Sequence, residues 1–320
     1  LVWGMNWITT KMPDSHWLTE ARLKGTKVVI ITVEYSATAS KGDEVIIIRP
    51  GTDPAFALGL AQVILSKKLY DHDWVTKNTD LPFLIRMDTL QPLRPEEVDA
   101  GALPGYIKRG LVNTTVLQAG AKMPPGIQHK GQLAAAPMAA ELQPFLIWDS
   151  KQHRLVPITR DDMGPGFVKK GLTPDLHANQ KIKLKDGSEV EVRTHFALLE
   201  QYLNDNMTSK QVEQITGAPA QAIESLAEQI AKNPEKTTIA TGMGPNQFFN
   251  ADLKDRAILL VAALTRNLGF PGGNVGSYAG NYRAALFGGL PAFSVEDPFK
   301  VQSDPKGKVE TKKYLHYESL

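Results

Sequence analysis

The strongest constraint on the fold is a strand, a turn and a helix in immediate succession, in residues 43–65 (DEVIIIRPGTDPAFALGLAQVIL). The run from Val45 to Ile48 is apolar and β-branched, which is typical of a strand covered on both faces in a parallel sheet. Pro50 and Gly51 end that strand. In an open α/β sheet such a turn lies at the carboxyl edge of the strands, where ligands bind.

The helix after this turn has its own start signal. Asp53 followed by Pro54 predicts an N-cap with proline at the first helical position. Apolar residues then recur at the spacing of one helix face: Phe56, Leu60, Val63 and Ile64. The amides of Gly51, Thr52 and Asp53 therefore stand where they can meet an anion or the edge of a ring.

Residues 1–65 repeat this alternation of strand and helix. A strand at the start of the chain is followed by a helix from Pro13 that Gly25 ends. Lys27 to Val33 then predicts a second buried strand, and 43–48 the third. This order predicts an α/β fold with a doubly wound, mostly parallel sheet.

Residues 81–195 follow another pattern, because they hold 11 of the 21 prolines and have no long helical period. Two β-hairpins are predicted there, at 144–158 and 181–193. Asp186-Gly187 predicts a type I′ turn in the second hairpin. The rest, including Pro124-Pro125-Gly126, is predicted to be loop, so we expect a proline-rich insertion.

From Thr194 the pattern is helical again, and Thr208 with Gln211 predicts a capping box at the start of a short helix. A short strand at 237–241 (TTIAT) ends in Gly242-Met243-Gly244. A long helix follows, and seven glycines lie between Gly269 and Gly289. The apolar face of that helix is predicted to comprise Leu253, Ala257, Leu260, Leu264 and Leu268. The expected organisation is a cofactor-binding lobe at 1–80, an irregular lobe at 81–195 and a second α/β segment at 196–320. We expect 1–65 and about 236–290 to pack together.

Composition excludes several classes of function. The chain has 36 basic and 34 acidic residues, so no strong field toward nucleic acid is expected. It has no apolar run of membrane-spanning length, and no cysteine for a disulfide or a cysteine-ligated cluster. The seven histidines show no metal-binding spacing, and no G-x-S-x-G motif is present. No catalytic residue and no metal ligand is therefore predicted within these residues.

Two turns after strands, at 49–53 and 242–244, are the candidate ligand sites. Neither matches the glycine spacing of dinucleotide-binding or P-loop motifs, and turns of this kind are more often structural. Glu34, at the end of the second strand, stands where an acid can bind ribose hydroxyls or base amines, although a carboxylate there is more often only solvated. Without further information the sequence predicts an α/β chain with a ligand-binding sheet edge.

Four motifs carry a resemblance to a known family: WGMN at 3–6, MPDSHW at 12–17, GTK at 25–27 and RPGTDPA at 49–55. With them the chain resembles the molybdenum-bis(pyranopterin guanine dinucleotide) oxidoreductases of the DMSO reductase family, in the branch of respiratory nitrate reductase α subunits. The sequence of 280–299 (GNYRAALFGGLPAFSVEDPF) and that of the first 65 residues are most similar to nitrite oxidoreductase catalytic subunits.

The resemblance implies a set of cofactor-binding residues. Those expected to hold the guanosine part of one pyranopterin are Asn6, Glu34, Gly51, Thr52 and Asp53. Those expected to lie against the cofactor from the other lobe are Gly242, Met243, Gly244 and Asn246. This chain departs from the family pattern at Met5, where a small residue is usual, and at Glu34-Tyr35, where Asp-Pro-Arg is commoner.

The resemblance also implies the chemistry of a parent protein. A [4Fe-4S] cluster and the aspartate ligand of molybdenum would precede Leu1, so we expect an internal fragment that is inactive by itself. The parent would oxidise nitrite to nitrate and pass two electrons to an iron-sulfur β subunit, associated with the membrane through a membrane or haem subunit. A nitrate reductase α subunit is the alternative. A non-catalytic nucleotide-binding module is an alternative from another class.

Overall fold

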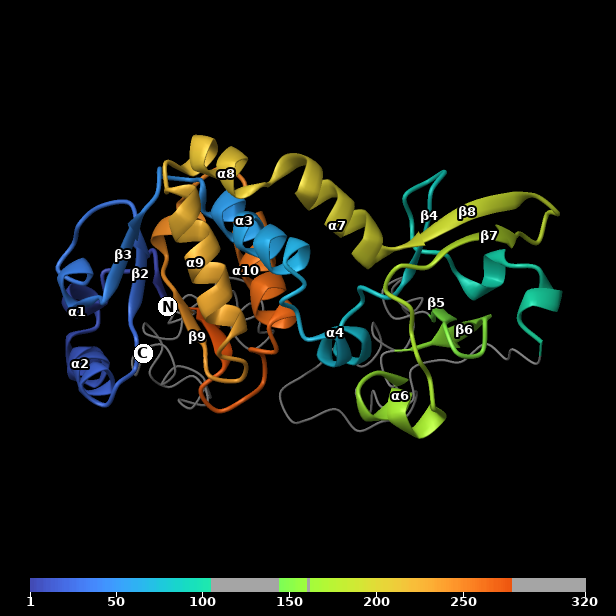
Figure 1. Cartoon of the computed structure of the whole chain (residues 1–320), viewed down its shortest axis with the longest axis horizontal. Helices are drawn as coiled ribbons and strands as arrows, with labels where there is room; N and C mark the ends of the chain where they lie inside the picture. The colour runs from blue at the N-terminus through green and yellow to red at the C-terminus, as the bar shows by residue number, and fades with distance from the viewer. Residues whose placement is uncertain (105–143, 160–161, 278–320) are drawn as a thin grey trace, which may run out of the picture. The chain divides into compact units, whose positions relative to one another are not determined.

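The computed structural model describes residues 1–104, 144–159 and 162–277, and these residues belong to one compact unit. The predicted loop at 124–126 and the motif at 280–299 lie outside the described residues. So do three of the seven glycines between Gly269 and Gly289. The described part is enough to define the central sheet and the helices that cover it (Figure 1).

Five parallel strands form the central sheet in the order β10-β9-β1-β2-β3. Their bounds are Val2–Trp3 (β1), Val29–Thr32 (β2), Glu44–Ile47 (β3), Thr238–Thr241 (β9) and Asn274–Ser277 (β10). The sheet thus joins the two ends of the described chain, as expected for 1–65 and for the described part of 236–290, which ends at Ser277. Among the described residues, 81–195 contributes no strand to it. The predicted boundaries at 80 and 195 stay predictions.

Side chains of β1 and β2 alternate between two apolar cores. Trp3, Val29 and Ile31 belong to the core on one face, and Val2 and Ile30 to the core on the other. This confirms that β2 is covered on both faces. For the edge strand β3 the prediction was wrong in part, because Ile47 is 49% exposed.

Helices lie on both faces of this sheet. On one face are α1 (Trp7–Thr10) and α2 (Ser15–Leu23), which contribute Trp7 and Leu18 to the smaller core. On the other are α3 (Asp53–Ser66), α9 (Ala220–Ala231) and α10 (Ala251–Leu264) (Figure 1). The result is a layer of strands between two layers of helices, as the predicted α/β class requires.

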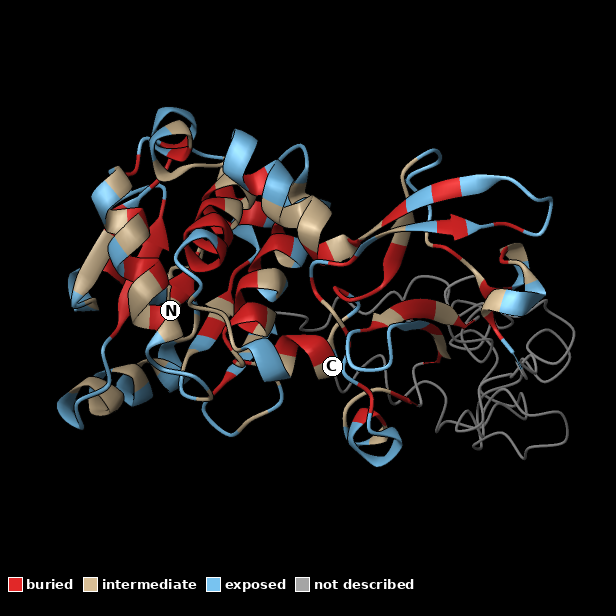
Figure 2. Cartoon of the chain, turned by 45° about the vertical axis from the view of Figure 1, so that its right-hand side comes forward, coloured by how far each residue is buried: buried red, intermediate tan, exposed pale blue. Residues whose placement is uncertain are grey.

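Helix α3 is more deeply buried than its predicted apolar face implies. The four residues of that face are all buried, and so are Ala57, Gly59, Ala61, Gln62 and Leu65 on its other sides. It packs against α9 and α10, and also against α7 (His195–Asn206) and α8 (Ser209–Thr216). The buried residues concentrate on the strands and the helix faces that meet them (Figure 2).

Two smaller antiparallel sheets come from the middle of the chain. One has the order β4-β8-β7, from Leu84–Arg86, Glu189–Thr194 and Asn179–Lys183, and the other pairs β5 (Phe145–Asp149) with β6 (Arg154–Ile158). Both predicted hairpins are therefore confirmed. The remaining described elements are α4 (His72–Asn78), α6 (Pro165–Lys170), η1 (Met12–Asp14), η2 (Ala39–Lys41), η3 (Pro95–Glu97), η4 (Ala100–Ala102) and η7 (Gly244–Gln247).

The turn between β7 and β8 differs from the predicted type I′ geometry. Gly187 has a φ of 87° and donates its N–H to the carbonyl of Leu184 at 3.0 Å. Lys185 and Asp186 are therefore the central residues of the turn, and neither has a positive φ. This arrangement is a three-residue loop in which glycine takes the left-handed position, as in a type I turn with a bulge.

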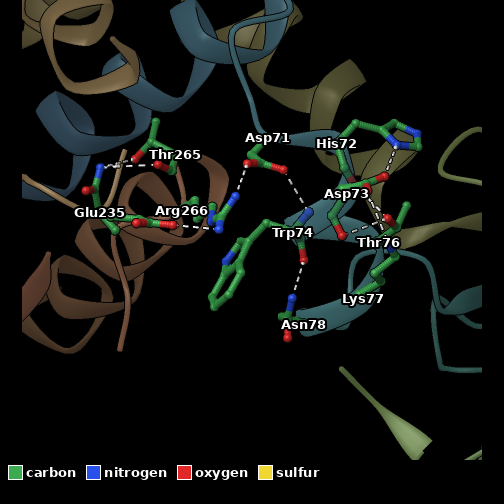
Figure 3. Close-up of polar contacts among 11 residues, drawn as sticks. Asp71, His72, Asp73, Trp74, Thr76, Lys77, Asn78, Glu235, Thr265 and Arg266 are labelled. Carbon is green, nitrogen blue, oxygen red and sulfur yellow. Dashed lines mark hydrogen bonds and ion pairs between the residues drawn. The ribbon is translucent and has the colours of Figure 1, made fainter. Parts of the chain in front are cut away.

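A polar cluster fastens the end of α10 to α4. The guanidinium of Arg266 bonds the carboxylate of Glu235 at 2.6 Å and lies 3.6 Å from one carboxylate oxygen of Asp71 (Figure 3). The other oxygen of Asp71 accepts the backbone N–H of Trp74 at 2.8 Å. Asp71 is the N-cap of α4. Its backbone N–H also donates to the carbonyl of Leu264 at 2.8 Å. The cluster therefore fixes the position of α4 relative to α10 and the turn before β9.

Candidate functional site

The order of the strands reverses between β1 and β9. From β1 the chain adds β2 and β3 on one side, and β9 and β10 lie on the other. In parallel α/β sheets, ligands bind outside the carboxyl ends of the strands at such a reversal. Gly4 follows β1 there, and Gly242 follows β9.

The turns after β1 and β9 are in direct contact. Gly242 donates its N–H to the carbonyl of Trp3 at 2.8 Å, and a Cβ at Gly242 would lie 2.2 Å from the carbonyl oxygen of Gly4. A Cβ at Gly4, whose φ is 61°, would lie 2.2 Å from the ring of Pro245. Contacts within the protein thus account for glycine at 4 and 242.

The turn after β3 reaches the same loop. A Cβ at Gly51, whose φ is 78°, would lie 3.3 Å from Phe248. Thr52 bonds back to the carbonyl of Arg49, through its hydroxyl at 2.7 Å and its N–H at 3.2 Å. The segment 242–248 therefore touches the turns after β1 and β3, and all three turns converge on one edge of the sheet.

Asp53 does not cap helix α3, so the predicted N-cap was wrong. The helix begins at Asp53 itself, with Thr52 at the N-cap position and no side-chain cap bond. The carboxylate of Asp53 is buried and accepts the indole N–H of Trp3 at 2.7 Å. Its role in guanine recognition stays a prediction, and the indole is a competing partner within the protein.

Burial sets the electrostatics of Asp53. Removal from water raises the pKa of its carboxyl, while the bond from Trp3 and the charge of Lys254 act in the opposite direction. Lys254, in α10, is fully buried. Its ammonium donates to the side-chain oxygen of Asn246 and lies 2.9 Å from a carboxylate oxygen of Asp255.

Sequence reasoning missed Lys254, although a signal was present. Helix α10 buries Ala257, Ile258 and Val261, and Lys254 stands three, four and seven residues before them on the same face. The predicted face began instead at Leu253, which is 47% exposed. The predicted face was thus rotated by about one residue because lysine was treated as a surface residue.

Asn6 lies at the edge, but its side-chain oxygen is used within the protein. It accepts the hydroxyl hydrogen of Thr38 at 2.9 Å, and that hydroxyl accepts the N–H of Ile8 at 2.9 Å. Thr38 is fully buried. Asn6 thus links the start of α1 to the turn before β3, and its cofactor contact stays a prediction.

Glu34 follows β2 at the same edge and is exposed. Within the described ranges its carboxylate has no hydrogen bond or ion pair, and Val33 and Tyr35 beside it are exposed at 46% and 68%. Unlike Asp53, this carboxylate is available to a ligand without breaking a contact of the protein.

The segment after β9 adds exposed apolar side chains, and the three turns together carry backbone amides without an acceptor. Met243, Phe248 and Phe249 are exposed at 38%, 42% and 91%. The amides of Met5, Gly51, Met243 and Gly244 have no acceptor in the part of the chain that the structure describes.

This set of groups fits one end of a nucleotide-like cofactor. Apolar side chains can cover a heteroaromatic ring, amides can donate to an anion or a ring oxygen, and the carboxylate of Glu34 can accept N–H groups. No group of three or more His, Cys, Asp or Glu in the described ranges is arranged to hold a metal ion. No helix in these ranges is long and apolar enough to cross a bilayer.

Comparisons with known proteins identify the family. The family model for molybdopterin oxidoreductases matches residues 1–315. The perchlorate reductase subunit alpha of Dechloromonas aromatica is 32% identical over 94% of this chain and 30% of its own length. The respiratory nitrate reductase subunit alpha of Haloferax mediterranei is 29% identical over 97% of this chain and 27% of its own length.

A solved structure, acetylene hydratase from Pelobacter acetylenicus, aligns with 82% of this chain and 20% of that chain, at a TM-score of 0.39 and 14% identity. That likeness is too low to support an argument. The family assignment rests on the sequence matches, in which the chain spans less than a third of its curated relatives. This chain belongs to the molybdopterin oxidoreductase family.

Proposed function

We propose that this chain is the part of a molybdenum-bis(pyranopterin guanine dinucleotide) catalytic subunit that holds the guanosine end of one pterin. The observation that carries the proposal is the convergence of the turns after β1, β3 and β9 on one edge, with free amides and an available carboxylate. Family membership supports a molybdenum-pterin cofactor.

Each residue type has a distinct role in this proposal. Glu34 accepts N–H groups from the guanine or hydroxyls from the ribose, because its carboxylate is exposed and uncommitted. The amides of Gly51, Met243 and Gly244 donate to the polar edge of the cofactor. The remaining residues of the proposed set mainly shape these turns, because contacts within the protein use their polar groups or the space beside them. These residues are Asn6, Thr52, Asp53, Gly242 and Asn246.

For the whole protein we propose oxidation of nitrite to nitrate. Nitrite and water would give nitrate, two protons and two electrons, and the molybdenum centre, when bound, supplies the oxygen-atom transfer. The electrons would leave through a [4Fe-4S] cluster to an iron-sulfur β subunit, and a membrane or haem subunit would attach the complex to the membrane. Relatives named for perchlorate and nitrate reduction support an oxyanion substrate.

Nitrate reduction is the alternative, because the same scaffold serves both directions of electron flow. Purified complex should reduce an electron acceptor when nitrite is added. Complex that reduces nitrate with quinol but gives no nitrite-dependent reduction of an acceptor would contradict nitrite oxidation and support the alternative.

A non-catalytic nucleotide-binding module is the second candidate, and the packing of Gly4 and Gly242 against the protein itself favours it. Metal and nucleotide analysis distinguishes the two. Molybdenum and acid-released GMP should co-purify with the complete protein, and Glu34→Gln should lower both per polypeptide. Glu189→Gln is the matched control, because Glu189 is an exposed glutamate in β8, which belongs to the separate sheet β4-β8-β7. Equal cofactor content in all three proteins would remove Glu34 from the site, and absence of molybdenum would favour the module.

A further inference from the structure

We propose that Lys254 is a positioning residue, which holds the segment 242–248 in the shape that the cofactor edge requires. The inference rests on the proposed function for its link to the cofactor. The contact itself stands independently: the ammonium of Lys254, in α10, donates to the side chain of Asn246, in η7.

A fully buried lysine is costly for a fold unless its charge is compensated. Lys254 has no exposed surface, yet its neighbours on the helix face are the apolar residues Ala257 and Ile258. An apolar side chain would pack there without a charge to compensate. The ammonium must therefore be compensated by its polar neighbours Asn246 and Asp255, and by the charge of Asp53.

Asn246 is the partner that gives this lysine a role at the edge. Asn246 lies in the exposed part of the segment, and Lys254 is the only hydrogen-bond partner of its side chain among the described residues. On one side of it Pro245 packs against Gly4, and on the other Phe248 packs against Gly51. One bond from the core thus anchors the middle of the segment that joins the turns after β1 and β3.

The consequence for the site is geometric. Met243 and Gly244, whose amides are free, stand directly before the anchored residues. If the segment moved, these donors and the exposed ring of Phe248 would lose their common orientation. Lys254 therefore acts on the cofactor through Asn246, without touching it.

The test compares Lys254→Met and Asn246→Ala in the complete protein. Lys254→Met keeps a long apolar side chain in the core and removes the ammonium, and Asn246→Ala alters only an exposed residue. In cofactor-free protein, hydrogen exchange of peptides covering 242–250 should rise about tenfold in both variants, because a hydrogen bond to a charged group is lost. Exchange across β2 should stay unchanged. In protein purified with its cofactor, molybdenum and GMP content should fall in both.

Two further variants separate positioning from general destabilisation. Asn246→Asp keeps an acceptor for the ammonium, so exchange of the 242–250 peptides in cofactor-free protein should match the wild-type value. Lys170→Met removes a different lysine, which pairs with the buried carboxylate of Asp162 away from the sheet edge. Hydrogen exchange of the 242–250 peptides should stay unchanged in this variant.

Unchanged exchange at 242–250 in Lys254→Met and Asn246→Ala would overturn the inference. Raised exchange with wild-type cofactor content would also overturn it, because the anchored shape would then not matter to the cofactor. Wild-type protein without molybdenum or GMP would instead refute the proposed function, and the exchange measurement would still decide whether Lys254 anchors the segment.

Discussion

Replacing Trp3 by phenylalanine should destabilise the cofactor-free protein by an amount that depends on pH. Phenylalanine keeps an aromatic ring beside Phe56, whose ring centroid lies 5.5 Å from that of Trp3, but removes the donor to Asp53. Loss of a hydrogen bond to a buried charge costs about 1.5–3 kcal/mol. The smaller ring adds a packing loss of about 1–2 kcal/mol, because Trp3 is fully buried.

The pH dependence follows from the carboxyl of Asp53. Its folded pKa is raised above the ordinary value of 3.8, so the folded state binds more protons than the unfolded state between those two values. The free energy of unfolding therefore falls as pH rises through this window. Without the indole donor the pKa of Asp53 in the folded state rises further, so the free energy of unfolding falls by more over this window. The loss in Trp3→Phe should therefore be greater at pH 7.5 than at pH 4, because more of the folded protein has a protonated carboxyl at pH 4 and that form needs the indole donor less.

Denaturant titrations of wild type and variant at the two pH values measure this difference. Phe56→Leu is the matched control, because it weakens the same aromatic pair and leaves the hydrogen bond in place, so its cost should not change with pH. The double variant Trp3→Phe/Asp53→Asn should lose the pH dependence. A cost for Trp3→Phe that is equal at both pH values would refute the role of the Asp53 charge.

Three other predictions concern local features. Gly242→Ala should lower stability by about 2 kcal/mol or more, because its Cβ would lie 2.2 Å from a backbone oxygen, whereas Gly276→Ala, with open space around it, should change the melting temperature little. Thr208→Ala removes the capping box of α8 and should cost about 0.5–2 kcal/mol in denaturant titrations. Asp43, whose pKa the bond from Arg22 lowers, contributes stability above pH 3.8 that is lost as pH falls, so Asp43→Asn should flatten the acid limb of the stability profile slightly.

Local patterns in the sequence predicted the elements whose cause is local. The capping box at Thr208 and Gln211 is present, both hairpins form, and the short strand at 237–241 is β9. The strand and helix at 43–65 were predicted because apolar periodicity reports burial directly. The order of strands in the sheet was predicted only as a class, since pairing between β1 and β9 joins segments more than 230 residues apart.

Asp53 shows why the details of the site were harder to predict. Asp followed by Pro is a common helix start, and no nearby residue indicated that its carboxylate would turn inward. Its partner Trp3 is 50 residues away in the sequence. The burial of Lys254 was missed for a related reason. Its spacing to Ala257 and Ile258 places it on the buried face of α10, but scales of hydrophobicity assign lysine to the surface, and its partner Asn246 is known only from the tertiary structure.

The two residues that were predicted wrongly, Asp53 and Lys254, both lie in the core beside the same edge of the sheet. The charge of Lys254 lowers the pKa of Asp53 against the effect of burial, and Asp53 begins the central helix α3, while Lys254 lies in α10, which packs against it. A buried charged side chain contributes little net stability compared with an apolar residue of the same size. The presence of Asp53 and Lys254 in the core is therefore better explained by what the polar bond of each holds in place: Trp3 at the end of β1 for Asp53, and Asn246 in the segment after β9 for Lys254. The order of the sheet reverses between β1 and β9, so these two side chains support the geometry of the edge where we place the cofactor.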